Sequence, residues 1–241
     1  MAKIIPLPRV SLGKKLSLET KQSVTTQALS ISNEDAWKYI ECMEEIKRRT
    51  IAVWMIIDRK VTTSFQATNI EFVCLQIRKI LELIALASIS ANKEEYSKQH
   101  ANFFKHWKAK KILESVGRIN PFFYPIPQRQ IIDPQSGEVK EVQLISEGFL
   151  TKEDFSVVYD SCSQALHASN PYGAPIQYSF FEKQIPQWMQ KIKTLLNHHQ
   201  VQLINKNNKR QALWVIMNAE EDGKAKGWIF QKIEPEIFMK E

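Results

Sequence analysis

Residues 70–89 constrain the fold more than any other part of this 241-residue chain. Their pattern predicts a helix, because apolar residues recur at spacings of three and four, which places them on one face. These residues are Ile70, Val73, Cys74, Ile77, Leu81, Ile84 and Ala87. The other side of this helix is also apolar, with Phe72, Leu75, Leu83, Leu86 and Ile89. A helix that is apolar nearly all round belongs in the middle of a helical bundle.

Four further helices are predicted by apolar spacing, over residues 32–57, 94–116, 151–166 and 185–196. Ser32 or Asn33 can cap the first of them, and Gly117 can end the second. Thr151 followed by Asp154 is typical of a capping box at the start of the third. Together with the central helix, these segments predict a bundle of about five helices.

Two regions have the alternation and turn residues of β-structure. Residues 128–132 and 139–145 flank Asp133–Gly137, which is typical of a turn, so they predict a β-hairpin. Runs at 201–204, 212–217 and 228–233 predict a three-stranded antiparallel meander. The expected class is therefore α+β, mainly α: a bundle with an inserted hairpin and a C-terminal meander.

The expected organisation is a basic arm followed by one compact domain. Residues 1–30 have little periodicity and predict an extended or mobile arm. Residues 31–241 predict a single domain, with a helical bundle over 31–198 that includes the hairpin at 128–145. A β appendage over 199–234 completes it.

The positive charge of the chain is concentrated in two places. The formal net charge is +7. The arm contributes +4, and residues 183–210, which contain no Asp or Glu, contribute +6, so the rest of the chain sums to −3. This distribution favours an anionic partner and indicates where it would bind.

The chain lacks the sequence motifs by which most enzyme classes are recognised. Enzymes of those classes are excluded, but enzymes in general are not. It contains no GxGxxG, no GxxxxGK[ST], no HExxH, no GxSxG and no CxxC. The three cysteines, Cys42, Cys74 and Cys162, lie at apolar-periodic positions and are expected to be small core residues. We expect no cofactor, no metal, no membrane association and a reduced, cytoplasmic location.

Arg78 and Glu82 are unusual because they lie in the most apolar helix. At a spacing of four residues they share a helix face and can pair. One interpretation is an ion pair that fixes the register between helices. The other is that they border a polar cavity that serves a function.

His167 and Asn170 lie where the helix over 151–166 gives way to an Asn-Pro turn. A histidine at a helix C-terminus can cap the last carbonyls and interacts favourably with the helix dipole. Alternatively, His167 is a general acid or base, or contacts a phosphate, beside a rigid turn.

The acid-free stretch supplies the candidate nucleic-acid contacts. They are Lys191, Lys193, Lys206, Lys209 and Arg210. The last three lie in Asn205–Arg210, which predicts an exposed turn between strands. Such clusters bind phosphate backbones through counterion release, and a solvated turn has the same composition.

Two of these segments together resemble the HEPN superfamily of small helical RNases. Residues 75–84 (LQIRKILELI) resemble its Arg-x-x-x-Glu helix, and residues 159–170 (YDSCSQALHASN) resemble the region of its Arg-x(4–6)-His motif. The resemblance implies that His167 is the catalytic histidine, that two protomers pair, and that the substrate is RNA. Positions 160–163 read Asp-Ser-Cys-Ser and carry no motif arginine, so either Arg78 replaces it or the protein is a non-catalytic member.

The leading hypothesis is therefore a HEPN-like protein of a prokaryotic defence or toxin-type system that binds or cleaves RNA, as a metal-independent endoribonuclease in the second case. His167 would be its acid or base and Arg78 its phosphate stabiliser, with Glu82 and Asn170 completing a polar centre. The alternative is a non-catalytic interaction or scaffold module with a basic turn that contacts nucleic acid. A homodimer or a larger complex is expected in either case.

Overall fold

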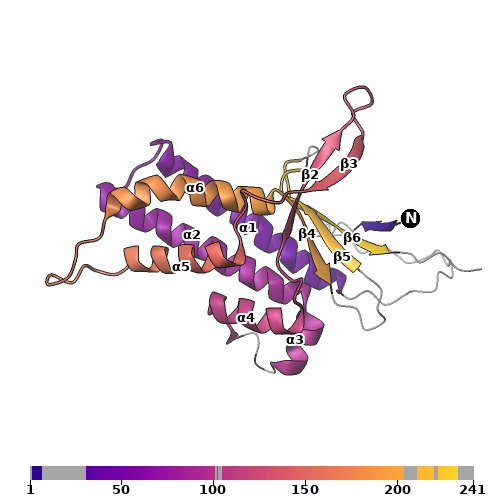
Figure 1. Cartoon of the computed structure of the whole chain (residues 1–241), viewed down its shortest axis with the longest axis horizontal. Coiled ribbons are helices and arrows are strands. Elements are labelled where there is room, and N and C mark those ends of the chain that lie inside the picture. Colours follow the sequence, from indigo (N-terminus) through magenta and orange to yellow (C-terminus); the bar gives the residue numbers. More distant parts are fainter. Residues whose placement is uncertain are drawn as a thin grey trace, which may run out of the picture.

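The computed structural model describes residues 2–6, 31–100, 102, 105–203, 211–219 and 222–232. These ranges form a helical bundle with a β-sheet at one end, as Figure 1 shows, which confirms the predicted α+β, mainly helical class. The helices are α1 (Asn33–Ile57), α2 (Gln66–Ala91), α3 (Lys93–Gln99), α4 (Ala109–Ile119), α5 (Lys152–Ala165) and α6 (Tyr178–Leu196). The strands are β1 (Ala2–Pro6), β2 (Ile126–Ile132), β3 (Val139–Leu144), β4 (His198–Leu203), β5 (Gln211–Ile216) and β6 (Lys226–Lys232).

Helix α2 lies in the middle of the bundle, as its apolar surface predicts. It packs against α1, α4, α5 and α6. Ile77, Ile80 and Leu81 are completely buried in these contacts, and so is Cys74. No helix in the described ranges is both long and apolar enough to span a membrane.

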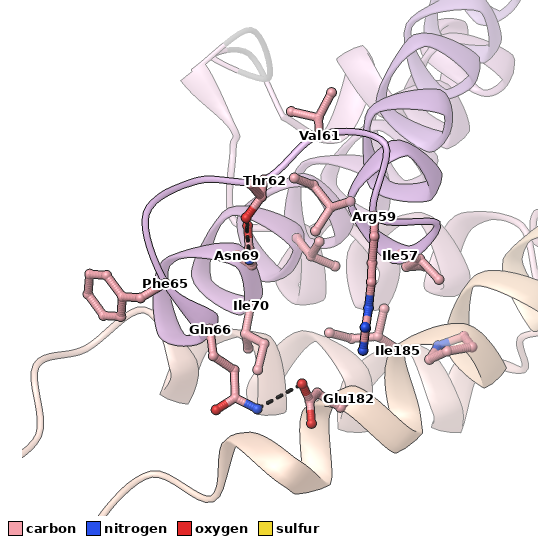
Figure 2. A pocket seen from close by; sticks show the side chains of 13 residues that line it. Ile57, Arg59, Val61, Thr62, Phe65, Gln66, Asn69, Ile70, Glu182 and Ile185 are labelled. Carbon is pink, nitrogen blue, oxygen red and sulfur yellow. Dashed lines mark hydrogen bonds between the residues drawn. The ribbon is translucent and has the colours of Figure 1, made fainter.

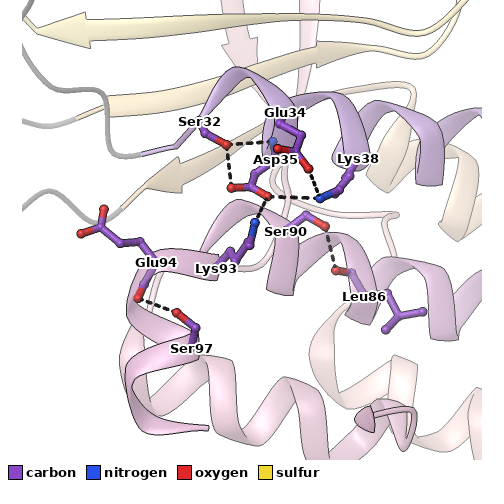
Figure 3. Close-up of polar contacts among 9 residues, drawn as sticks. All are labelled: Ser32, Glu34, Asp35, Lys38, Leu86, Ser90, Lys93, Glu94 and Ser97. Atoms are coloured by element: carbon purple, nitrogen blue, oxygen red, sulfur yellow. Dashed lines mark hydrogen bonds and ion pairs between the residues drawn. The ribbon is translucent and has the colours of Figure 1, made fainter. Parts of the chain in front are cut away.

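Polar contacts hold the start of α1 against the corner between α2 and α3 (Figure 3). The Ser32 hydroxyl caps α1, accepting a hydrogen bond from the Asp35 backbone N–H at 3.0 Å. The Asp35 carboxylate is nearly buried, at 8% exposure, and accepts a hydrogen bond of 2.9 Å from the Lys93 ammonium. A buried carboxylate needs such a partner, so Lys93 fixes the start of α1 relative to α3.

The helix predicted over 94–116 is instead two helices, α3 and α4, which are separated by residues 100–108. Tyr96 is buried in α3, and its hydroxyl lies 2.9 Å from Nδ1 of His106, beyond the break. Trp107, which lies in this break, is 65% exposed. Helix α4 runs on through Gly117, where a Cβ atom would lie 3.2 Å from the Phe123 ring. That close approach, rather than a helix end, explains this glycine.

The other two predicted helices are confirmed. Thr151 and Asp154 form both hydrogen bonds of the capping box that begins α5. Helix α6 contains Pro186 in its interior and begins earlier than predicted, at Tyr178.

The predicted hairpin and meander are parts of one antiparallel sheet, with strand order β1-β6-β5-β4-β2-β3. Strand β2 pairs with β3 as the predicted hairpin and also with β4, where Ile126 faces Gln200. Strand β1, from the segment predicted as an arm, pairs with β6. The rest of that arm, residue 1 and residues 7–30, lies outside the described residues.

Burial alternates along the sheet strands and defines two faces. His199, Val201 and Leu203 of β4 are buried, as are Leu213 and Val215 of β5 and Ile229 of β6. The intervening residues are only partly buried. Because side chains alternate between the two faces of a sheet, the buried set forms the inner face, which packs on the helices.

A buried histidine connects the inner face to the bundle. The Nδ1 atom of His199 lies 2.8 Å from the Leu196 carbonyl oxygen. Its Nε2 atom lies 2.8 Å from the hydroxyl oxygen of Tyr39 in α1. A carbonyl only accepts, so Nδ1 carries the proton and Nε2 accepts from Tyr39. Burial lowers the pKa of His199 to about 4 and raises the pKa of Tyr39 above its ordinary value.

We expect His199 to make the folded state less stable as the pH falls from about 6.5 to 4. In this window the unfolded chain binds a proton at His199, whose ordinary pKa is about 6.5, and the folded chain does not. The expected slope is about 1.4 kcal/mol per pH unit, measured by urea unfolding across the window.

The variant His199→Gln removes the titrating group and is expected to lose this slope. His167→Gln is the matched control, because His167 is exposed, and it should keep the slope. Equal slopes in wild type and His199→Gln would contradict the buried neutral state.

Candidate functional site

Arg78 and Glu82 form a three-membered polar cluster with Tyr159 of α5. The Arg78 guanidinium lies 3.5 Å from the Glu82 carboxylate and donates a hydrogen bond of 3.1 Å to the Tyr159 hydroxyl. That hydroxyl donates in turn to Glu82, at 3.2 Å. The guanidinium carbon also lies 4.9 Å from the centre of the Tyr159 ring, which adds a cation–π contact.

This cluster is electrically balanced and joins α2 to α5. The side chains of Arg78 and Glu82 are about one-quarter exposed, so each is partly desolvated and partnered by the other. These contacts agree with the interpretation of a helix-fixing ion pair. Sequence reasoning missed Tyr159, although its position beside the core residues Phe155 and Cys162 places it on the flank of the face that packs on α2.

His167 and Asn170 lie in the loop that follows α5, away from this cluster. His167 is exposed, and its backbone N–H donates to the Gln164 carbonyl at 3.2 Å. Eight residues separate it from Tyr159, which corresponds to roughly 12 Å along a helix. The Asn170 side chain accepts a hydrogen bond from the Tyr172 backbone N–H at 3.0 Å and so shapes its own turn. The structure therefore brings Arg78 and Glu82 together, without His167 or Asn170.

The predicted basic contacts fall into three groups. Lys191 forms an ion pair of 2.9 Å with Asp154, which links α6 to the first turn of α5. Lys193 is exposed on α6. Lys206, Lys209 and Arg210 lie outside the described residues, in the connection between β4 and β5.

The outer face of the sheet carries a group of aromatic side chains that we term the aromatic face: His198, Trp214, Trp228 and Phe230. Trp214 and Trp228 are directly opposite in the β5–β6 register, with ring centroids 5.6 Å apart. Phe230 packs edge-on against Trp214, also at 5.6 Å, and His198 lies 6.5 Å from Trp214 on the other side. All four rings are partly exposed, so they form a continuous strip across three strands.

The outer face beside these rings is rich in amides. Gln200 lies opposite Trp214 in the β4–β5 register, and Gln202 follows on the same face. In β2 the Gln128 side chain accepts a hydrogen bond of 2.6 Å from the Trp214 indole N–H, which fixes the orientation of that ring. The sequence signal for this face was the alternation in residues 212–217 and 228–233, which predicted strands but not which residues of different strands would lie side by side.

The described residues contain no group of three or more His, Cys, Asp or Glu side chains arranged to hold a metal ion. The thiols of Cys42 and Cys162 are poor nucleophiles, because the pKa of each is raised. A hydrogen bond with Cys74 and burial raise the pKa of Cys162, and burial raises that of Cys42 to about 11. All three cysteines are unpaired, and Cys74 and Cys162 are buried as expected of core residues.

Comparisons with protein-family models, curated proteins and solved structures found no match to this chain. The resemblance to the HEPN superfamily stays a prediction.

We expect Tyr159→Phe to lower the free energy of unfolding by about 1 kcal/mol, because the change removes the hydroxyl shared by Arg78 and Glu82. Urea unfolding measures this loss. Tyr172→Phe makes the same chemical change at a side chain that is 97% exposed and should have almost no effect. Equal effects of the two substitutions would show that the cluster does not stabilise the fold.

Proposed function

We propose that this protein binds single-stranded nucleic acid, with RNA as the first candidate, on the aromatic face of its sheet and does not cleave it. The observation that carries the proposal is the continuous strip formed by Trp214, Trp228 and Phe230. Bases of any sequence stack on such rings, because every base has a π-face. Sheets that bind single strands present aromatic residues on neighbouring strands in this way.

The charge distribution supports an anionic partner for this face. The connection between β4 and β5 carries Lys206, Lys209 and Arg210. It joins two of the strands that carry the aromatic face. The whole stretch 183–210 has six cations and no acid. Cations near a stacking surface attract the phosphate backbone while the rings hold the bases.

The glutamines add hydrogen-bonding capacity without charge. Gln200 and Gln202 are partly exposed on the same face as the rings. Amide side chains both donate and accept, so they suit the edges of unpaired bases. The outer face thus combines the two side-chain types that single-stranded bases contact.

The contacts of the proposed catalytic residues favour binding over cleavage. Arg78 is engaged by Glu82 and Tyr159, and His167 lies roughly 12 Å further along by helix rise. An acid or base must come within about 3 Å of the group with which it exchanges a proton, directly or through one water. Within one protomer, Arg78 and His167 do not meet around a common reacting atom.

We expect Trp228→Leu to weaken binding of a fluorescent single-stranded RNA 20-mer roughly 5- to 150-fold. The basis is that loss of one base–aromatic stack costs about 1–3 kcal/mol. Fluorescence anisotropy measures Kd, and circular dichroism verifies the fold of the variant. Trp107→Leu is the matched control, because Trp107 is exposed outside the sheet and should leave Kd unchanged.

A second arm of the same titration tests the charge. Neutralising Lys206, Lys209 and Arg210 to Gln should flatten the slope of log K against log salt by about 2, since each contact to a single strand contributes about 0.7. The control neutralises Lys79, Lys111 and Lys140, which are exposed elsewhere. Equal effects of the two triple variants would contradict a localised site. RNA cleavage that His167→Ala abolishes would instead support the catalytic hypothesis.

A further inference from the structure

Helix α1 ends in a motif that strongly favours glycine, yet the critical position holds Arg59. The Lys60 backbone N–H bonds to the Met55 carbonyl at 2.9 Å, and the Arg59 N–H bonds to the Ile56 carbonyl at 3.0 Å. These are the paired bonds of a Schellman motif, which requires a left-handed residue just past the helix end. Arg59 supplies it with φ of 56°, and no other non-glycine residue in the described ranges has a positive φ.

An arginine gains nothing locally in this conformation. Left-handed backbone brings Cβ close to the following carbonyl, which glycine avoids and which Asn or Asp can offset with local hydrogen bonds. Within the described residues, the Arg59 side chain forms neither a hydrogen bond nor an ion pair. The helix end therefore tolerates a disfavoured residue whose charged group has no hydrogen-bond or ion-pair partner among the described residues.

The Arg59 side chain lines a cavity of about 760 Å³ between the α1–α2 turn and α6. Figure 2 shows the guanidinium reaching from the turn toward the part of α6 that carries Glu182 and Ile185. The apolar wall includes Ile57, Ile70 and Ile185. A volume of this size is ordinary for a small-molecule site.

The other polar groups that line the cavity are already engaged. The Glu182 carboxylate accepts a hydrogen bond of 2.7 Å from the Gln66 amide. The Asn69 side chain accepts from the Thr63 backbone N–H at 2.8 Å and donates to the Thr62 hydroxyl at 3.1 Å. Arg59 is thus the charged group of this cavity whose bonding capacity is unused within the described residues.

We propose that this cavity binds an amphipathic monocarboxylate, whose carboxylate pairs with Arg59 and whose apolar body contacts Ile57, Ile70 and Ile185. A guanidinium binds a carboxylate through two parallel hydrogen bonds, which suits a single planar anionic group. Glu182 lines the same cavity and repels an anion more strongly the more negative charge it carries, which favours a monocarboxylate over phosphates and polyanions. This inference is independent of nucleic-acid binding, because it uses the opposite end of the bundle.

Decanoate is the probe, with decylammonium as its charge-reversed counterpart. We expect isothermal titration calorimetry to detect decanoate binding to the wild type and much weaker binding of decylammonium. Arg59→Gln, which removes the charge and keeps a side chain, should weaken decanoate binding at least about tenfold, since it removes a charge-assisted bidentate contact. Lys60→Gln, a neighbouring exposed cation, is the matched control and should not change it.

The variant Arg59→Gly separates a loss of ligand binding from a loss of folding. It places glycine in the left-handed position and should raise the melting temperature of the ligand-free protein by about 3 °C while abolishing decanoate binding. A more stable protein that has lost the ligand is the result expected of a residue retained for binding. Undetectable decanoate binding to the wild type, equal affinity in wild type and both Arg59 variants, or equal affinity for decylammonium would each overturn the proposal.

Discussion

The enclosure of α2 is the constraint on which the rest of the structure depends. Because this helix is apolar on nearly every side, α1, α4, α5 and α6 must surround it. Two of its four charged residues, Arg78 and Glu82, therefore contact Tyr159 of α5. Each side chain is about one-quarter exposed and is partnered by the other, so we expect the pair to stabilise the contact between α2 and α5.

The attachment of the sheet to this bundle decides which side chains face outward. His199 is held between Tyr39 of α1 and the Leu196 carbonyl, so the inner face of β4 is locked against the helices. Since side chains alternate along a strand, the neighbouring His198 and the rings of Trp214 and Trp228 must then lie on the other face. A buried neutral histidine on one face of the sheet thus positions the proposed binding surface on the other.

Local features of this fold could be predicted, and non-local ones could not. Thr151 and Asp154 predicted the start of α5, and Asp133–Gly137 predicted the turn between β2 and β3. Both features could be predicted because each depends only on residues that are close together in the sequence. The pairing of β2 with β4 joins residues more than seventy positions apart and has no local signal. The break between α3 and α4, which is spanned by the contact of Tyr96 with His106, has no local signal either. The aromatic face depends on strand register. In the candidate site, the Arg78–Glu82 pair was predictable from spacing, whereas the separation of His167 from it required the structure.

Photo-crosslinking of the wild-type protein to single-stranded RNA that contains 4-thiouridine, with the crosslinked peptides mapped by mass spectrometry, most directly tests whether the sheet is the binding surface. Stacking on the outer face predicts crosslinks in the segments of β5 and β6 that carry Trp214, Trp228 and Phe230. Crosslinks concentrated at the end of α5 around His167, with none on the sheet, would contradict binding on the aromatic face. They would indicate that the RNA binds at the predicted catalytic residues instead.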